Sequence, residues 1–235
     1  MKTIKMADAF GKLAGICAGL EGRYTPAHQN LLPSSLAAQL TGAQAALESV
    51  NTAEREMRNA VAERAQAFQD LVKLASRIRI LLEVDPAMSS TLADADLPLK
   101  KLALNRYKKA LKRPESSAEG ESSTRSYARG TDYLSRIAHL EHVVEALRQN
   151  PAYKANASDL TVNALTERLV QMKALQQKFI AAETDLEAKR SVIRMVFHAP
   201  FTGIAATGTA VRKSICSQFG LRSPEAVAIK GIRFK

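Results

Sequence analysis

The chain contains two matching stretches: residues 24–68 read YTPAHQNLLPSSLAAQLTGAQAALESVNTAEREMRNAVAERAQAF, and residues 153–197 read YKANASDLTVNALTERLVQMKALQQKFIAAETDLEAKRSVIRMVF. They align without a gap although their identity is low, and the matched pairs include Tyr24 with Tyr153, Leu31 with Leu160, Leu36 with Leu165, Leu40 with Leu169, and Phe68 with Phe197. Two amphipathic helices share some leucines by chance, but a register that holds over such a length favours duplication. We therefore interpret the chain as two similar units in tandem.

In both stretches the apolar residues recur at steps of three and four, which is the spacing of a helix that buries one face. The first stretch carries Leu36, Leu40, Ala43, Leu47 and Val50, and the second carries Leu165, Leu169, Met172, Phe179 and Leu186. This heptad seam predicts a long helix over residues 34–68, continued or kinked into a second helix that ends near residue 83. In the second unit it predicts a long helix that is broken at His198, Ala199 and Pro200.

Each predicted unit ends in a shorter apolar piece, and the two pieces also align. The matched pairs are Leu97 with Val227, Leu99 with Ile229, Leu102 with Ile232, and Leu104 with Phe234. The period of the first piece is nearer two than 3.6 in places, so we expect a short extended tail after each unit. Between the units, residues 114–126 read PESSAEGESSTRS and contain no large apolar residue. They cannot bury enough surface to offset their ordering entropy, which predicts a flexible linker.

These patterns predict an all-α fold made of two tandem three-helix units that form antiparallel helical bundles around their long heptad-bearing helices. The first unit spans residues 1–113, the linker residues 114–126, and the second unit residues 127–235. The composition agrees with this expectation, because alanine, leucine, glutamine, lysine, arginine and glutamate dominate the chain and all favour helices.

The composition also argues against several classes of protein. The two cysteines, Cys17 and Cys216, are far apart and belong to no short motif, which argues against a disulfide scaffold, a zinc ribbon and a CxxC redox site. The apolar run near the N-terminus is interrupted by Asp8 and Lys12, and no clean cleavage site follows it. No stretch has the length and apolarity of a membrane span. We expect a cytoplasmic protein without a membrane span.

The formal net charge of +11 favours anionic surroundings. One run concentrates seven basic residues without an acid: Lys100, Lys101, Arg106, Lys108, Lys109, Lys112 and Arg113. With Tyr107 among them, these residues form a candidate face for binding nucleic acid or another polyanion through its phosphates. The alternative is a solvated basic face that only keeps the protein soluble, and we favour this alternative.

The sequence offers weak candidates for metal binding and no catalytic motif. His139 and His142 stand one helical turn apart and could share a metal, with Glu145 one turn further on. A carboxylate site in a helical bundle needs Glu-x-x-His pairs, however, and neither histidine follows a glutamate by three residues. There is no phosphate-binding glycine loop, no HExxH motif and no nucleophile elbow. We expect no cofactor, no catalytic residues and no enzyme activity.

Two glutamates, Glu54 and Glu183, hold matched positions on the heptad seam. A buried carboxylate there would need a partner, and Arg64 and Arg190 are within reach of it. The alternative is that the seam drifts around the helix, because 3.6 does not divide seven, so that Ala53 and Ala182 face inward instead. We favour the alternative.

The second unit resembles a family of uncharacterised all-helical bacterial proteins over residues 126–235, and the first unit looks like a diverged copy. The resemblance rests on Ser126-Tyr127, Pro151-Ala152-Tyr153, Asn156, Asp159-Leu160, Leu165, Leu169, Ala188, Arg190, Gly203, Phe219-Gly220, Ser223-Pro224 and the ending Lys230-Gly231-Ile232-Arg233-Phe234. It implies a helical fold and no particular chemistry. The chain departs from the family at Phe197-His198, where relatives carry a Leu-Tyr pair.

The expected function is that of a non-enzymatic helical interaction or scaffold module, with a protein partner or a second copy of the chain. The first alternative is binding of nucleic acid or another polyanion through the basic face at Lys100–Arg113. The lesser alternative is a metal-dependent bundle enzyme that uses His139 and His142.

Overall fold

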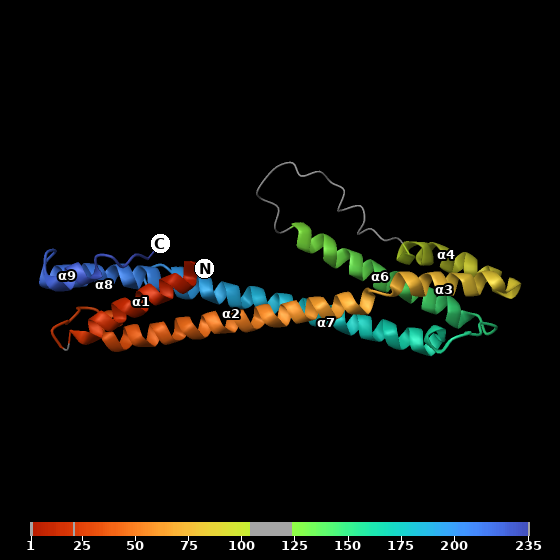
Figure 1. The fold of residues 1–235 in the computed structure, drawn as a ribbon, viewed down its shortest axis with the longest axis horizontal. Helices are drawn as coiled ribbons and strands as arrows, with labels where there is room; N and C mark the ends of the chain where they lie inside the picture. The colour runs from red at the N-terminus through yellow and green to blue at the C-terminus, as the bar shows by residue number, and fades with distance from the viewer. Residues whose placement is uncertain (1, 21, 104–123, 235) are drawn as a thin grey trace. The chain divides into compact units, whose positions relative to one another are not determined.

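The computed structural model describes residues 2–20, 22–103 and 124–234, and every regular element in these residues is a helix (Figure 1). The α-helices are α1 Lys2–Gly19, α2 Pro33–Phe68, α3 Leu71–Val84, α4 Ser89–Ala103, α6 Thr124–Gln149, α7 Val162–His198, α8 Ile204–Phe219 and α9 Pro224–Ile229. The 3-10 turns η1 Gln29–Leu31, η2 Pro86–Met88 and η3 Ser158–Leu160 precede α2, α4 and α7. The predicted all-α class is confirmed. None of these helices is both long and apolar enough to cross a membrane.

The helices end where their residues stop or cap them. α2 ends at Phe68, so the predicted kink separates it from α3, and α7 ends at His198, at its predicted break. After α8, Gly220 adopts a φ of 92°, a left-handed conformation that glycine tolerates best. α9 begins after Ser223, whose side chain accepts a hydrogen bond from the backbone N–H of Ala226.

The extended tail predicted at residues 97–104 is instead helical as far as Ala103. Within α4, Ala95, Leu99 and Leu102 are buried at helical spacing, and the helix contains Pro98. Burial of this helical face therefore outweighs both the alternating pattern and the proline. In the second predicted tail, Val227 and Ile229 likewise belong to a helix, α9, and residues 230–234 lie outside the regular elements.

The structure divides into two compact units, and the division differs from the predicted one. The terminal unit consists of residues 1–57 and 182–235, and the central unit consists of residues 58–181. Each unit therefore takes residues from both halves of the sequence. Of the predicted linker, residues 124–126 belong to the start of α6, and residues 114–123 lie outside the described residues.

The core of the terminal unit combines the first helices of the chain with the last ones. α1 and α2 supply Phe10, Leu13, Cys17, Leu36 and Ala43, and the later part of the chain supplies Phe197, Ile204, Val211, Ile215 and Ile229. The ring of Phe234 meets that of Phe10 edge-on, with 6.3 Å between the ring centres. Burial raises the pKa of the Cys17 thiol to about 11, so this thiol stays neutral and acts as a small apolar side chain.

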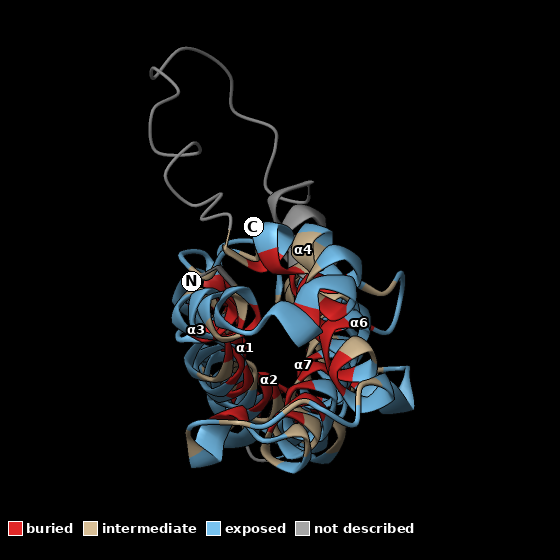
Figure 2. Cartoon of the chain, turned by 90° about the vertical axis from the view of Figure 1, so that its right-hand side faces the viewer, coloured by how far each residue is buried: buried red, intermediate tan, exposed pale blue. Residues whose placement is uncertain are grey.

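The core of the central unit has the reciprocal composition. The first half of the sequence supplies Phe68, Leu71, Ile78, Leu82 and Leu99, and the second half supplies Leu140, Val143, Leu147, Leu165 and Met172. In Figure 2 the buried residues, in red, follow one side of each helix while the other side is exposed. This is the amphipathic pattern from which the helices were predicted.

The two units correspond element by element in their buried positions. Phe10, Leu13 and Cys17 of α1 match Leu140, Val143 and Leu147 of α6, and Leu71, Ala75, Ile78 and Leu82 of α3 match Ile204, Gly208, Val211 and Ile215 of α8. Each unit joins the first helix of one half to the third helix of the other half. Neither half of the sequence contains a complete core. The duplication itself stays a prediction.

We expect neither half to fold alone, because each half would leave unpaired the apolar faces that now meet the other half. Fragments 1–103 and 124–235, expressed separately, should show little cooperative thermal unfolding by circular dichroism. Mixed together, they should form a one-to-one complex that unfolds cooperatively. A cooperative thermal transition of either fragment as a monomer would contradict this expectation.

The second expectation concerns Gly208, where an added Cβ would meet the ring of Phe234 at 2.5 Å. Gly208→Ala should lower the free energy of unfolding by about 1–3 kcal/mol, measured by urea denaturation, because the ring has to move. Gly15→Ala is the matched control, since a Cβ there meets nothing within 4 Å. That change should raise the free energy of unfolding by about 1 kcal/mol. In a Phe234→Ala background, Gly208→Ala should lose its cost; a cost that persists would refute the role of the ring.

Candidate binding groove between α3 and α4

The structure describes two of the seven residues of the predicted polyanion-binding face. Lys100 and Lys101 lie in the last turn of α4. The ammonium of Lys100 pairs with the carboxylate of Asp96 at 2.6 Å, whereas the Lys101 side chain is exposed. The other members, Arg106, Lys108, Lys109, Lys112 and Arg113, lie outside the described residues.

The weak metal candidates lie on α6 in the central unit. His139 is half-buried and His142 is exposed. In the described parts of the chain, no group of three or more histidine, cysteine, aspartate or glutamate side chains is arranged to hold a metal ion.

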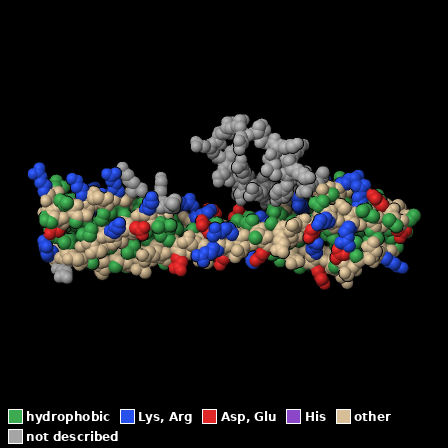
Figure 3. Space-filling model, viewed as in Figure 1, with side chains coloured by type: hydrophobic (Ala, Val, Ile, Leu, Met, Phe, Trp, Pro, Cys, Tyr) green, Lys and Arg blue, Asp and Glu red, His purple; other side chains and the backbone are tan. Residues whose placement is uncertain are grey.

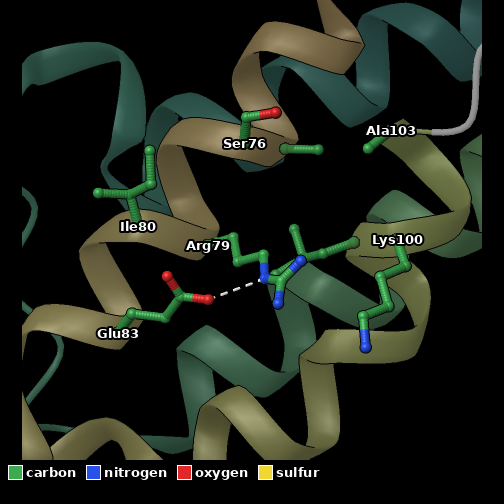
Figure 4. Close-up of a pocket in the computed structure, with 8 residues that line it drawn as sticks. Ser76, Arg79, Ile80, Glu83, Lys100 and Ala103 are labelled. Carbon is green, nitrogen blue, oxygen red and sulfur yellow. Dashed lines mark hydrogen bonds and ion pairs between the residues drawn. The ribbon is translucent and has the colours of Figure 1, made fainter.

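A groove of about 720 Å³ lies between α3 and α4 in the central unit (Figure 4). η2 turns the chain so that α4 packs against α3, and Leu99 of α4 is buried between them. The lining residues come from both helices: Ala75, Ser76, Arg79, Ile80 and Glu83 from α3, and Leu99, Lys100 and Ala103 from α4. Its volume lies within the range of about 300–1,000 Å³ that is typical of binding pockets.

A chain of ion pairs crosses from one side of this groove to the other. The guanidinium of Arg79 bonds to Glu83 at 2.9 Å, as Figure 4 shows, and lies 3.6 Å from the carboxylate of Asp96 on α4. Asp96 pairs in turn with Lys100. The hydrogen bond from Lys100, together with the charges of Lys100 and Arg79, lowers the pKa of Asp96. These charges largely neutralise one another, so the groove does not favour one sign of ligand.

The apolar side of the α3–α4 groove is open to solvent. Ile80 lines the groove and is 60% exposed, and Val84, four residues further along α3, is 76% exposed. Residues four apart lie on one face of a helix, so these two side chains form a short apolar ridge. The one hydroxyl of the lining, that of Ser76, donates a hydrogen bond to the carbonyl oxygen of Val72. The groove thus presents apolar surface beside internally paired charges.

Sequence reasoning missed a buried arginine in the central unit. Arg64 was considered as a carboxylate partner, but its side chain lies between two aromatic rings and is 3% exposed. Its guanidinium carbon is 4.2 Å from the ring centre of Tyr133 and 3.4 Å from that of Phe179. It also donates a hydrogen bond to the side-chain oxygen of Gln176 at 3.2 Å. The only signal in the sequence was an arginine interrupting the apolar seam.

The predicted glutamate–arginine contact occurs in the terminal unit, at the surface. Glu54 lies 3.4 Å from Arg190, and both side chains are more than 40% exposed. Ala53, which the drifting seam would turn inward, is 3% exposed, and its matched residue Ala182 is half-buried. The structure therefore agrees with the favoured alternative at this position, and the ion pair contributes little to stability because water screens it.

We expect Arg64→Lys to lower the free energy of unfolding by about 2 kcal/mol, since the compact ammonium of lysine cannot stack between two rings as a planar guanidinium does. Urea denaturation measures this change. Arg58→Lys, at an exposed position of the same helix, is the matched control and should change stability by less than about 0.5 kcal/mol. Equal stabilities of the two variants would argue against the stacking.

Comparison with known proteins adds no relative: no protein-family model, no curated protein and no solved structure matches this chain.

Proposed function

We propose that the protein is a non-enzymatic helical interaction module that binds a protein partner through the α3–α4 groove. The observation that carries this proposal is the apolar ridge of Ile80 and Val84 beside the groove. Two large aliphatic side chains one turn apart and more than half exposed are expensive to leave in water, and such surface is typical of interaction sites. No arrangement of groups around the groove suggests a reaction.

The partner that fits best is an amphipathic helix. A helix laid along a groove between two others buries its apolar face on side chains spaced as Ile80 and Val84 are. The ion pairs at Arg79 and Asp96 would then lie at the rim, where charges affect specificity more than affinity. Because the rim charges compensate one another, the partner needs no strong net charge.

We expect the double variant Ile80→Asp with Val84→Asp to lose at least about tenfold in partner affinity, because each aspartate places a charge in the apolar contact. Affinity capture with the full chain identifies the partner, and titration of the purified partner measures the change. The control is Val170→Asp, an equally exposed position on α7 of the same unit.

The thermal midpoints of both variants show whether either one is unfolded. Retained binding by a folded Ile80/Val84 variant would refute the groove as the binding surface. Loss of binding in the Val170 variant as well would show that the effect is not specific to the groove, and would equally refute it.

The alternatives stay predictions. Polyanion binding through the Lys100–Arg113 face is tested by a gel-shift titration at several salt concentrations, because phosphate contacts weaken steeply as salt rises. Binding that is absent at low salt, or insensitive to salt, would remove this alternative. Metal analysis of the purified protein tests the enzyme that would use His139 and His142.

A further inference from the structure

The terminal unit contains an open pocket of about 490 Å³ between the loop that follows α1 and the side of α8. The loop contributes Thr25, Pro26, Ala27, His28 and Leu31, and α8 contributes Ala210, Lys213, Ser214, Ser217 and Gln218. Gln218 holds the two walls together, because its side-chain oxygen accepts a hydrogen bond from the Thr25 backbone N–H at 3.2 Å and its nitrogen donates to the Arg23 carbonyl oxygen. Hydrogen bonds from Gln218 thus hold the loop and α8 together at this pocket.

The lining of this pocket is rich in donors and contains no carboxylate. Lys213 supplies an ammonium, His28 an imidazole, and Ser214 and Ser217 supply hydroxyls. Within the described residues, Lys213 takes part in no ion pair. The α3–α4 groove, in contrast, carries Glu83 next to its cations. A positive, donor-rich lining without a compensating acid selects for an anion.

The buried hydroxyl of Tyr24 makes no well-formed hydrogen bond. Tyr24 is 4% exposed, and no group of the described residues meets hydrogen-bond geometry with its hydroxyl. Its matched residue in the central unit, Tyr153, donates to the carbonyl oxygen of Leu160 at 2.7 Å. Burial raises the pKa of Tyr24, and hydrogen bonding with the hydroxyl of Ser214, which lines the pocket, partly offsets this. The Tyr24 hydroxyl thus has the Ser214 hydroxyl as a candidate partner, and Tyr24 itself does not line the pocket.

The central unit fills the matching place in a different way. The alignment of the two long stretches pairs Asn30 with Asp159, and the alignment of α8 with α3 pairs Ala210 with Arg77. Arg77 and Asp159 form a two-pronged ion pair that ties the loop to α3. The terminal unit lacks both charged groups at these positions. In the central unit, the place that corresponds to the pocket is therefore closed by the ion pair between Arg77 and Asp159.

Four donors of the pocket are particular to the terminal unit. Their counterparts in the central unit are apolar: Ala157 for His28, Ile80 for Lys213, Leu81 for Ser214, and Val84 for Ser217. The shared fold is thus formed with either kind of side chain at these positions. Packing therefore does not require these donors, of which His28, Lys213 and Ser217 are exposed.

We propose that this pocket binds a small organic phosphate. The phosphate oxygens would accept hydrogen bonds from Lys213, His28 and the two serine hydroxyls, as anionic oxygens do from charged and hydroxyl donors. Pro26, Ala27 and Leu31 give an apolar wall for the organic part. The volume lies in the range of pockets that hold small organic ligands, which extends well above the size of a bare ion.

The surroundings strengthen the attraction for an anion. Residues 204–234 contain the bases Arg212, Lys213, Arg222, Lys230 and Arg233, and Glu225 is the single acid. Glu225 is itself neutralised by Arg23 at 2.7 Å. On the face shown in Figure 3, basic side chains, in blue, gather over the end formed by α8 and α9. A cluster of one sign raises the local concentration of oppositely charged ligands.

Calorimetric titration of the full chain with phenyl phosphate and with inorganic phosphate tests the proposal. We expect phenyl phosphate to bind more tightly than inorganic phosphate, because only the former reaches the apolar wall. Lys213→Gln should weaken phenyl phosphate binding by about tenfold, since it removes the charged donor. Lys230→Gln, an exposed lysine of the same unit outside the pocket lining, should leave the affinity within about twofold.

A second variant introduces into the terminal unit the ion pair that closes the corresponding place in the central unit. Asn30→Asp combined with Ala210→Arg reproduces the Arg77–Asp159 pair, and it should abolish binding while the thermal midpoint is kept. Absence of binding by the unaltered chain, equal affinities for the two phosphates, equal effects of the two lysine variants, or full binding by the folded double variant would each overturn the proposal.

Discussion

The whole structure depends on one constraint: each half of the sequence carries apolar faces that it cannot bury by itself. Phe10 of α1 packs in the same core as Phe197 of α7 and Ile215 of α8, and Leu140 of α6 packs with Leu71 and Ile78 of α3. Apolar burial is the main favourable contribution to folding. Since each core needs contributions from both halves, the two units are expected to be coupled in stability although each is compact.

This constraint also explains the length of α2 and α7. α2 contributes Leu36 and Ala43 to the terminal core and Phe68 to the central core, and α7 contributes Leu165 to the central core and Phe197 to the terminal one. A helix rises about 1.5 Å per residue, so only a long helix can serve two separate cores. Where the seam passes from apolar residues to Arg64, the guanidinium is accommodated between the rings of Tyr133 and Phe179. The stacking on both rings, with the hydrogen bond to Gln176, helps to offset the cost of burying this charge.

The sequence was sufficient to predict the two long helices and the breaks that end α2 and α7, because periodic apolar residues and prolines act locally. It was not sufficient to predict which helices share a core. α3 and α8 carry the same apolar period, so the pattern does not decide which of them packs with α1 and which with α6. The alternation at Leu97–Leu104 misled for a similar reason, because tertiary burial of Leu99 and Leu102 decided the outcome. Of the candidate residues, the structure describes Lys100 and Lys101. The ion pair of Lys100 with Asp96 follows from their i, i+4 spacing in α4, whereas the groove beside it depends on packing between α3 and α4.

The corresponding surfaces of α3 and α8 differ in chemistry at paired exposed positions. Their buried positions match residue for residue, because changing them would open a cavity or overfill the core. Their exposed positions are released from that requirement, and they diverge in opposite directions: Ile80 and Val84 on α3 are apolar, whereas Lys213 and Ser217 on α8 are polar. Lys73, Ser76, Arg77 and Glu83 on α3 are exposed and polar as well, so the difference lies at these paired positions and not over the whole helices. At these positions the side chains agree with the two proposed surfaces, an apolar one on α3 and an anion-binding one on α8.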